Sequence, residues 1–348
     1  MSIVELESVS FTEETLVLNP THLLNITDDT GLFQHCRYSV PDRMHGYTLD
    51  DNVRALIVAA GSEHPALLAR LDTYLSFVMY CQRPDGLFRN FMGYDRRFLE
   101  EVGSADSQGR TVWALGVLYQ QCPAYRPLVE PMLKAALPHL SAITHLRAKA
   151  FAILGLHFYL QANPFDQAVQ AQLERLADDL QACWQTNLKE ASWQWFEDAL
   201  TYENARLPQA MFAAFLTTGR KVYLETARQA TAFLEKTQFE RGYLKLVGNQ
   251  GWLQRGQKLA EYDEQPVDAG ALVEMFAMAY QATRDNSYRE LAHQAFGWYL
   301  GRNCNNLALY EPISGGCYDA LTKKGVNLNQ GAESVLSYQM ALHSLKTF

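Results

Sequence analysis

Carboxylate, amide and guanidinium side chains gather in six short clusters along this chain, and each cluster stands directly before a strongly apolar stretch. A pair of carboxylates can act as general acid and general base, or as acid and nucleophile. Amides and guanidiniums supply hydrogen bonds to polar groups. A sugar presents hydroxyls to such groups and apolar ring faces to aromatic side chains. The residue types and their grouping therefore favour chemistry on a carbohydrate.

The candidate site residues fall into two sets. For the reaction we expect Glu203 or Asp51 as the acid and Glu333 or Asp198 as the base. The substrate-binding set contains polar and aromatic side chains of the same clusters and their loops: His45, Tyr47, Asp50, Asn52, Arg54, Asp106, Gln108, Arg110, Trp113, Trp195, Phe196, Glu197, Tyr202, Asn204, Arg206, Tyr262, Asp263, Gln265, Asn329 and Gln330. No metal or cofactor is expected, since no metal-binding or nucleotide-binding motif occurs.

Roles within the binding set differ by residue type. Trp195, Phe196 and Tyr47 are expected to form platforms for sugar rings. The arginines Arg54, Arg110 and Arg206 are expected either to hold acids in place or to bind a uronate or a phosphate. The second possibility leaves room for a phosphorylase.

Several of these residues also fit purely structural roles. Acids are favoured at the start of a helix, so Asp50, Asp51 and Glu203 can serve as caps. Asp51 and Arg54 stand three residues apart and can form an ion pair. Glu333 has the stronger functional case, because a carboxylate in an otherwise apolar helix is costly unless it is paired or faces a wet cavity.

The elements that must position these side chains form a repeat. Each cluster opens a helix that is apolar on nearly every face, which is the pattern of a helix buried on all sides. Between these helices lie amphipathic ones, at 65–81, 166–184, 223–237 and 288–303, with apolar residues at three- and four-residue steps. The clusters begin at Asp50, Asp106, His145, Glu203, Glu264 and Asn329.

Alternating buried and amphipathic helices predict an all-α fold, an (α/α)6 toroid with the buried helices inside. We expect one domain over residues 1–348, with the N-terminal ~20 residues as an extension. Inner helices of such a ring run in the same direction, so their N-termini and the six clusters meet at one mouth. Short β-hairpins are expected in the loops, because residues 243–247 alternate in polarity.

Composition excludes several classes of partner. The chain has 348 residues, of which 48% are hydrophobic, and a net charge of -8, so binding to nucleic acid or to an anionic membrane is not expected. The N-terminus lacks a basic region followed by an apolar one, and no apolar run reaches the ~20 residues that span a bilayer. The six scattered cysteines fit reduced thiols. We expect a cytoplasmic protein.

Three motifs carry a resemblance to known proteins: HGYTLDDNVRAL at 45–56, WFEDALTYENARLPQAM at 195–211 and NQGAESVLSY at 329–338. With the helical repeat over roughly residues 20–345, the chain resembles the six-hairpin glycosidase superfamily of (α/α)6 toroids. That superfamily includes glycoside hydrolases and N-acylglucosamine 2-epimerases. The motifs also resemble helical domains found beside or fused to bacterial glycosyltransferases, although this chain lacks the two Rossmann-like halves of a nucleotide-sugar transferase.

The resemblance implies a glycoside hydrolase that acts on an oligosaccharide through acid and base carboxylates, with inversion as the usual outcome. One alternative is a sugar epimerase or isomerase. The inner helix ends carry mostly acids and amides where such epimerases carry histidines, and His145 and His157 fit the core or a helix interface better. The other alternative is a non-catalytic oligosaccharide-binding module that partners a glycosyltransferase. The sugar and its linkage remain open.

Overall fold

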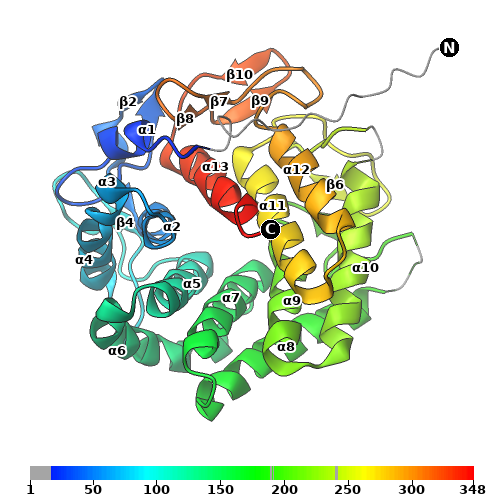
Figure 1. Ribbon diagram of the computed structural model, residues 1–348, viewed down its shortest axis with the longest axis horizontal. Coiled ribbons are helices and arrows are strands. Elements are labelled where there is room, and N and C mark those ends of the chain that lie inside the picture. The colour runs from blue at the N-terminus through cyan, green and yellow to red at the C-terminus, as the bar shows by residue number, and fades with distance from the viewer. Residues whose placement is uncertain (1–16, 189, 191, 240–241) are drawn as a thin grey trace.

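The computed structural model describes residues 17–188, 190, 192–239 and 242–348. Its inner helices form a closed ring in which each packs against the next and the last packs against the first (Figure 1). The expected (α/α)6 toroid is thereby confirmed. The inner helices are α2 (Leu49–Ala60), α5 (Ala105–Gln121), α7 (Leu146–Ala162), α9 (Arg206–Thr218), α11 (Pro266–Thr283) and α13 (Ala332–Leu345).

An outer layer of helices covers the ring, and each inner helix packs against a partner from this layer. The amphipathic pattern explains the arrangement, because the apolar face of each outer helix is buried against the ring while its charged face meets solvent. The outer helices are α1 (Thr21–Asn25), α3 (Pro65–Leu68), α4 (Leu71–Cys81), α6 (Arg126–Ala136), α8 (Gln167–Asn187), α10 (Lys221–Gln238) and α12 (Ser287–Gly297). Short 3-10 helices lie at Arg43–His45, Pro123–Tyr125 and Leu137–Ala142.

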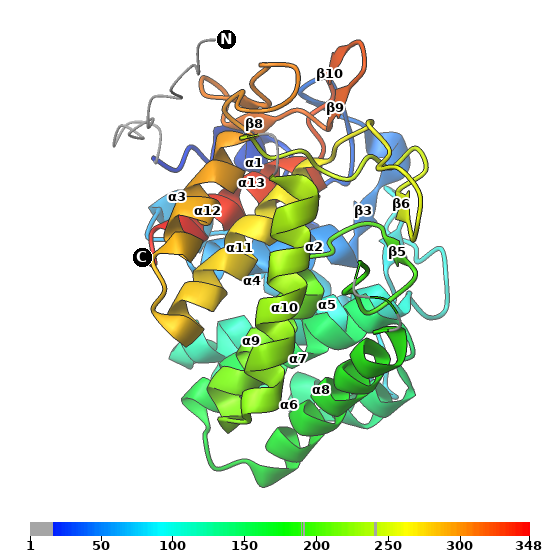
Figure 2. The same cartoon turned by 90° about the vertical axis from the view of Figure 1, so that its right-hand side faces the viewer.

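Short antiparallel strand pairs occupy the loops. They are β1 (Cys36–Arg37) with β2 (Val40–Pro41), β3 (Tyr47–Thr48) with β4 (Phe91–Met92), β5 (Ala199–Leu200) with β6 (Leu253–Gln254), β7 (Tyr310–Glu311) with β8 (Gly316–Cys317), and β9 (Ala320–Thr322) with β10 (Gly325–Asn327). Tyr47 is the register partner of Met92, so this pair ties the segment before α2 to the segment before α5. Figure 2 shows β3, β5 and β6 on the side of the ring away from the C-terminus.

Residues 243–247 do not form the strand that their alternation predicted. Leu244, Leu246 and Val247 are all buried, and so is Lys245, which pairs with the buried Glu264 just before α11. An alternating strand with one solvent-facing side does not fit a segment that is buried on both sides. Of the expected N-terminal extension, residues 1–16 lie outside the described residues. Within the described ranges, no helix combines the length and apolarity needed to cross a membrane.

The closest helix contact in the ring is that between α5 and α7, and glycines make it possible. A Cβ at Gly155 would overlap the backbone carbonyl of Val112 on the neighbouring helix, and Gly116 approaches the backbone of Gly155 in the same way. Since the obstacle is backbone rather than a mobile side chain, neither helix can yield without moving apart. Small residues at these positions therefore set the radius of the ring at this point.

Gly155→Ala is expected to lower the free energy of unfolding by about 1–3 kcal/mol, because the added methyl forces two packed helices apart. Gly297→Ala is the matched control, since its Cβ would meet only the flexible side chain of Arg302, with Cδ at 2.9 Å. Thermal and urea unfolding of both variants measure the effect. Equal stabilities of the two variants would contradict the packing argument.

Candidate functional site

One mouth of the ring opens into a cavity of about 540 Å³. Each of the six inner helices, or the loop just before it, contributes to this mouth, as the common direction of the helices requires. The structure brings together these residues of the candidate set on the cavity wall: Asp50, Asp51, Arg54, Asp106, Arg110, Tyr202, Gln265 and Glu333. Clusters far apart in the sequence thus share a single hollow.

Helix caps place the acids at the rim. Thr48 is the N-cap of α2, and its hydroxyl accepts a hydrogen bond from the amide of Asp51 at 3.2 Å while donating to Asp51 Oδ2 at 2.6 Å. Ser104 caps α5 in the same manner, so that Asp106 stands in the first turn. Asp106 accepts a hydrogen bond of 2.6 Å from the hydroxyl of Tyr202. The partial positive charge of each helix N-terminus favours these acids.

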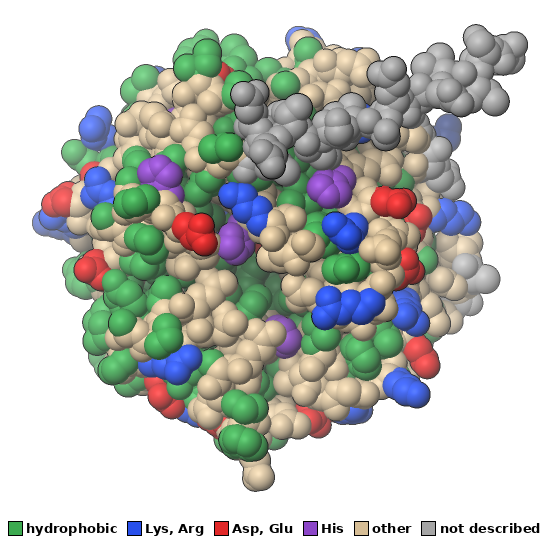
Figure 3. Space-filling model, viewed as in Figure 1, with side chains coloured by type: hydrophobic (Ala, Val, Ile, Leu, Met, Phe, Trp, Pro, Cys, Tyr) green, Lys and Arg blue, Asp and Glu red, His purple; other side chains and the backbone are tan. Residues whose placement is uncertain are grey.

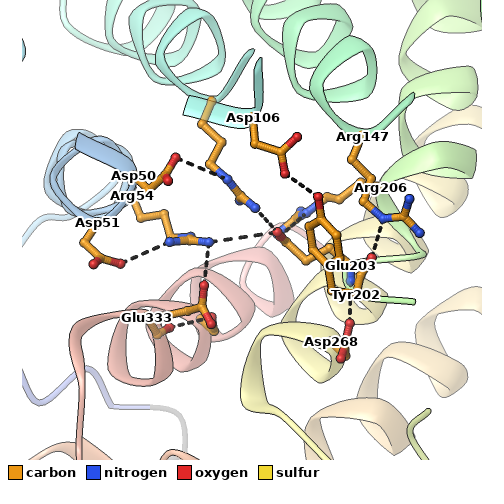
Figure 4. Close-up of polar contacts among 12 residues, drawn as sticks. Asp50, Asp51, Arg54, Asp106, Arg147, Tyr202, Glu203, Arg206, Asp268 and Glu333 are labelled. Carbon is orange, nitrogen blue, oxygen red and sulfur yellow. Dashed lines mark hydrogen bonds and ion pairs between the residues drawn. The ribbon is translucent and has the colours of Figure 1, made fainter. Parts of the chain in front are cut away.

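Arg54 connects three of the four acids that the sequence proposed for the reaction (Figure 4). Its guanidinium lies 3.1 Å from Asp51 Oδ1, 2.8 Å from Glu333 Oε2 and 3.9 Å from Glu203 Oε2. The side chain of Glu333 is 46% exposed and meets the cavity, whereas Glu203 is 1% exposed and lies beneath the wall. Asp51 and Glu333 are therefore the two expected acids that a ligand can reach here.

Glu203 sits at the centre of a buried charge network. Its carboxylate accepts hydrogen bonds from Arg110 and, at 3.0 Å, from Arg206. Burial opposes ionisation, but the guanidiniums of Arg110, Arg206 and Arg54 outweigh it and hold the pKa of Glu203 well below its usual value. Glu203 is consequently a permanent counter-ion that holds the arginines in place, and it is unsuited to donate a proton at neutral pH.

Burial has the opposite effect on the acids that have fewer cationic partners. It raises the pKa of Asp51 to about 6, with Arg54 opposing the shift and the charge of Glu333 adding to it. Burial likewise raises the pKa of Asp50, against the attraction of Arg110 and Arg54. The pKa of Asp268, on the first turn of α11, lies well above its usual value because of burial and the charges of Glu203 and Glu333. The cavity and the network beneath it therefore contain carboxyl groups whose pKa values are shifted in opposite directions.

Two histidines that the sequence analysis left out of the site line the cavity. His35 directly precedes β1, and partial burial of its ring together with the neighbouring His45 lowers its pKa. The expectation that His145 belongs to the core or a helix interface is wrong, because it is exposed at the start of α7 and its side chain makes no capping bond. The other site residues were recognised because they stand directly before an inner helix. His145 stands in the same position before α7.

The two imidazoles stand on different sides of the cavity. The backbone carbonyl of Gln34 accepts a hydrogen bond of 3.1 Å from the amide of Ala332, which places the neighbouring His35 beside the start of α13. His145 directly precedes α7. Among the six inner helices, α7 lies three positions from α13, so these two helices face each other across the toroid (Figure 1). A ligand held in the cavity would therefore lie between the two segments that carry these histidines.

Four aromatic candidates do not line this cavity. Trp195 and Phe196 are fully buried and pack against each other and, for Trp195, against Phe233. Tyr47 is 1% exposed and donates a hydrogen bond of 2.6 Å to Asp28. Trp113 points into the interior of the ring. Trp195, Phe196 and Tyr47, which were expected to form platforms for sugar rings, are buried because the segments that carry them fold back over apolar surface. Phe91, from β4, is an aromatic side chain that does line the cavity.

Several polar candidates instead stabilise the loops that frame the cavity. Asn52 accepts from the amide of Leu32 at 2.9 Å, and Gln108 exchanges hydrogen bonds of 2.9 and 2.8 Å with the backbone of Phe88. Asn204 closes its own turn by accepting from Thr201 at 2.9 Å. These amides are buried and their hydrogen-bonding capacity is used by backbone groups.

The remaining candidates lie away from the cavity wall. Asp198 is 80% exposed and pairs with Arg255, while Glu197 pairs with Arg147, each at 2.8 Å. His45 lies 4.0 Å from Asp42. Four others make hydrogen bonds within loops: Tyr262 donates to Asn305, and the amide of Asp263 donates to Asn249. Asn329 accepts from the amide of Tyr38, and the backbone carbonyl of Gln330 accepts from His22. Arg206 is buried and donates to Glu203.

Further residues of the wall come from the loops before α2 and α13 and from the first turn of α13. Gln34, Asp319 and Ser334 belong to this group, and Asp319 accepts a hydrogen bond of 2.8 Å from the hydroxyl of Ser334. Their polar types resemble those of the predicted clusters, but Gln34 and Asp319 stand too far from a helix start for the repeat pattern to single them out. Over the described part of the chain, no group of three or more His, Cys, Asp or Glu residues is arranged to hold a metal ion.

No family model matches the chain, and no curated protein matches it. Solved structures do match. A sugar epimerase from a ruminal bacterium is 12% identical, with a TM-score of 0.74 over 96% of this chain and 98% of that chain. Cellobiose 2-epimerase from Bacillus thermoamylovorans is 11% identical, with a TM-score of 0.75 over 97% and 98%. An α-1,6-mannanase of the GH76 group from Salegentibacter is 11% identical, with a TM-score of 0.64 over 96% of each chain.

These likenesses establish the fold, which is the six-hairpin (α/α)6 toroid shared by sugar epimerases and mannanases. The identities are too low to carry an activity across. None of the three structures is a glycosyltransferase, so they give no support to the expected association with one.

Glu203→Gln is expected to lower the free energy of unfolding by about 3 kcal/mol or more, because it leaves buried guanidiniums without their shared counter-ion. Glu333→Gln is the control, since it removes a charge from the same network at a half-exposed position, where an ion pair contributes under about 1 kcal/mol. Chemical denaturation at pH 7 compares the two. Equal losses would show that Glu203 is not the centre of the network.

Proposed function

We propose that this protein is a sugar epimerase or isomerase that transfers a proton at a carbon next to the sugar carbonyl. The observation that carries the proposal is the placement of His35 and His145 on different sides of one polar cavity. Inversion at such a carbon requires a base on one face of the carbon and a proton donor on the other. Two imidazoles across a cavity supply this arrangement.

His35 is suited to accept the proton, because burial and the adjacent His45 favour its neutral form. Removal of the proton from the carbon leaves an enediolate, whose negative oxygen needs a hydrogen-bond donor. Arg110 lines the cavity, and its Nη1 has no hydrogen-bond partner among the described residues. Return of a proton from the side of His145 to the same carbon gives the epimer, and return to the neighbouring carbon gives the ketose.

The acids of the wall bind sugar hydroxyls in this scheme. Asp50, Asp106 and Glu333 lie at the cavity surface, and carboxylate oxygens accept hydrogen bonds from hydroxyls. The comparisons support the choice of reaction, since the named epimerases align with TM-scores of 0.74 and 0.75 against 0.64 for the mannanase. A D-mannose isomerase also aligns, with a TM-score of 0.71 over the full length of both chains.

Incubation of the protein with mannose, glucose and cellobiose in D2O tests the proposal. We expect an epimer or ketose that carries deuterium at the carbon next to the carbonyl, detected by NMR. His35→Asn and His145→Asn should each lower kcat by about 100-fold or more, because each removes one proton-transfer group. His139→Asn, at a partly exposed histidine outside the cavity that bonds to the backbone of Asp85, is the control and should retain activity.

Two other outcomes would overturn this proposal. Shortened saccharides without deuterium would identify a glycoside hydrolase. Absence of turnover on any saccharide, with binding retained, would indicate an oligosaccharide-binding module.

Glycoside hydrolysis is the second candidate, and the pair of Asp51 and Glu333 favours it. Both carboxylates contact the same guanidinium, and the raised pKa of Asp51 suits a general acid beside a second carboxyl group. The separation of the two carboxyl groups about a bound sugar would decide between inversion and retention.

A pH profile tests this second candidate. If Asp51 is the acid, hydrolysis of an aryl mannoside or glucoside should fall as the pH rises through about 6, since the proton is lost there. Asp51→Asn should abolish hydrolysis by orders of magnitude, whereas Asp198→Asn, at an exposed acid outside the cavity, should not. A rate that stays constant from pH 5 to 8 would contradict a role for Asp51 as the acid.

A further inference from the structure

The opposite mouth of the ring contains a second cavity, which the proposed reaction does not use. Its volume is about 140 Å³, and Val117, Met278 and Met340 contribute apolar wall while Trp113, Gln209 and Glu274 contribute polar groups. Figure 3 shows this face of the molecule, with a hollow near the centre whose floor is hydrophobic and whose rim also carries histidine, charged and other polar side chains. The first cavity lies at the other end of the inner helices.

The indole of Trp113 is the first sign of a ligand. The side chain is 3% exposed and lines this cavity, and its Nε1 has no hydrogen-bond partner among the described residues. A buried donor without a partner costs about 1–3 kcal/mol, so such donors are rare unless water or a ligand satisfies them. The wall around it combines apolar side chains with polar ones.

Two acceptors lie beside the indole. Arg206 stacks over the ring of Trp113 at 4.6 Å and donates to Glu274 Oε1 at 2.9 Å and to Gln209 Oε1 at 2.8 Å. Both acceptors line the cavity, so a donor that enters it meets a carboxylate and an amide next to the unpaired indole. Burial raises the pKa of Glu274, and Arg206 opposes this shift. The charge of Arg206 is already balanced by Glu203 and Glu274, which leaves no demand for a charged ligand.

We propose that this second cavity binds a compact neutral molecule that carries one hydroxyl on an apolar ring, such as a phenol or a cyclic alcohol. A hydroxyl both accepts and donates, so it can accept from Trp113 Nε1 and donate to Glu274 or Gln209. The apolar ring then lies against Val117, Met278 and Met340. The size fits, since an engineered apolar cavity of about 150 Å³ binds benzene.

Arg206 joins this site to the first cavity, because it also donates to Glu203 at 3.0 Å, and Glu203 bonds to Arg110 on the first cavity wall. A continuous chain of buried ion pairs thus runs through the ring from one mouth to the other. Binding at the second site stands independently of the reaction at the first, and its test measures binding alone.

Titration with phenol, followed by NMR of the indole N–H resonances, tests the proposal. The chain has six tryptophans, and we expect saturable movement of one resonance, which Trp113→Phe removes and thereby assigns. Benzene is the matched control ligand, because it fills the apolar part but offers no hydroxyl. It should move that resonance far less.

Calorimetry supplies a second readout. Trp113→Phe keeps an aromatic ring but deletes the donor, and it should weaken phenol binding about five-fold, the contribution of one hydrogen bond. Val117→Phe leaves the indole intact and fills the cavity, so it should abolish binding. The proposal would be overturned if phenol at millimolar concentration moved no indole resonance. It would also be overturned if the wild type and Val117→Phe bound phenol equally well.

Discussion

The ion-paired carboxylate of Glu203 is the interaction on which the interior of this ring depends. Glu203 lies in the turn just before α9, and it is 1% exposed among guanidiniums supplied by α2, α5 and α9. Each of those arginines has a second acid, namely Asp51 or Glu333 for Arg54, Asp50 for Arg110 and Glu274 for Arg206. A buried charge is tolerated only when it is paired in this way. The network therefore fixes the register of three inner helices and the positions of the acids at both cavities.

The backbone of Glu203 is held as firmly as its side chain. Its φ is 42°, in the left-handed region that residues with a side chain rarely adopt. The amide of Glu203 donates a hydrogen bond to Asp268 Oδ1, from the first turn of α11. Burial and the nearby negative charges raise the pKa of Asp268 above its usual value. An unfavourable backbone conformation at one helix start is thus maintained by its neighbour, as is typical of functional sites.

The fold was predictable from the sequence because its cause is local. The periodicity of a single segment shows whether its helix is apolar on all faces or on one. Six repeats of a fully apolar helix followed by an amphipathic helix require a closed double layer. Because the inner helices run in the same direction, the clusters that contain Asp51 and Glu333 were expected to share one cavity, and both residues line it. These conclusions needed no knowledge of side-chain orientation.

The identity of the wall residues depended on orientation, and there the sequence was a weaker guide. Trp195 and Glu197 belong to the same loop, yet the first is fully buried and the second pairs with Arg147 outside the cavity. His145 stands directly before its inner helix, as the predicted acids do. It has no carboxylate, so a pattern of paired acids does not select it. Which way a loop side chain turns is decided by the surface that the loop folds against, and that surface consists of residues far away in the sequence.

The charge of the wall bears on the substrate. Five acids line the first cavity, Asp50, Asp51, Asp106, Asp319 and Glu333, against the two arginines Arg54 and Arg110. Both guanidiniums already contact carboxylates, so a phosphate or uronate that entered would have to displace an existing ion pair and would face the remaining acids. A neutral sugar has no such cost, since its hydroxyls can donate to the acids without disturbing the arginines. The arrangement of the network thus favours the first of the two roles predicted for the arginines, that of holding acids in place.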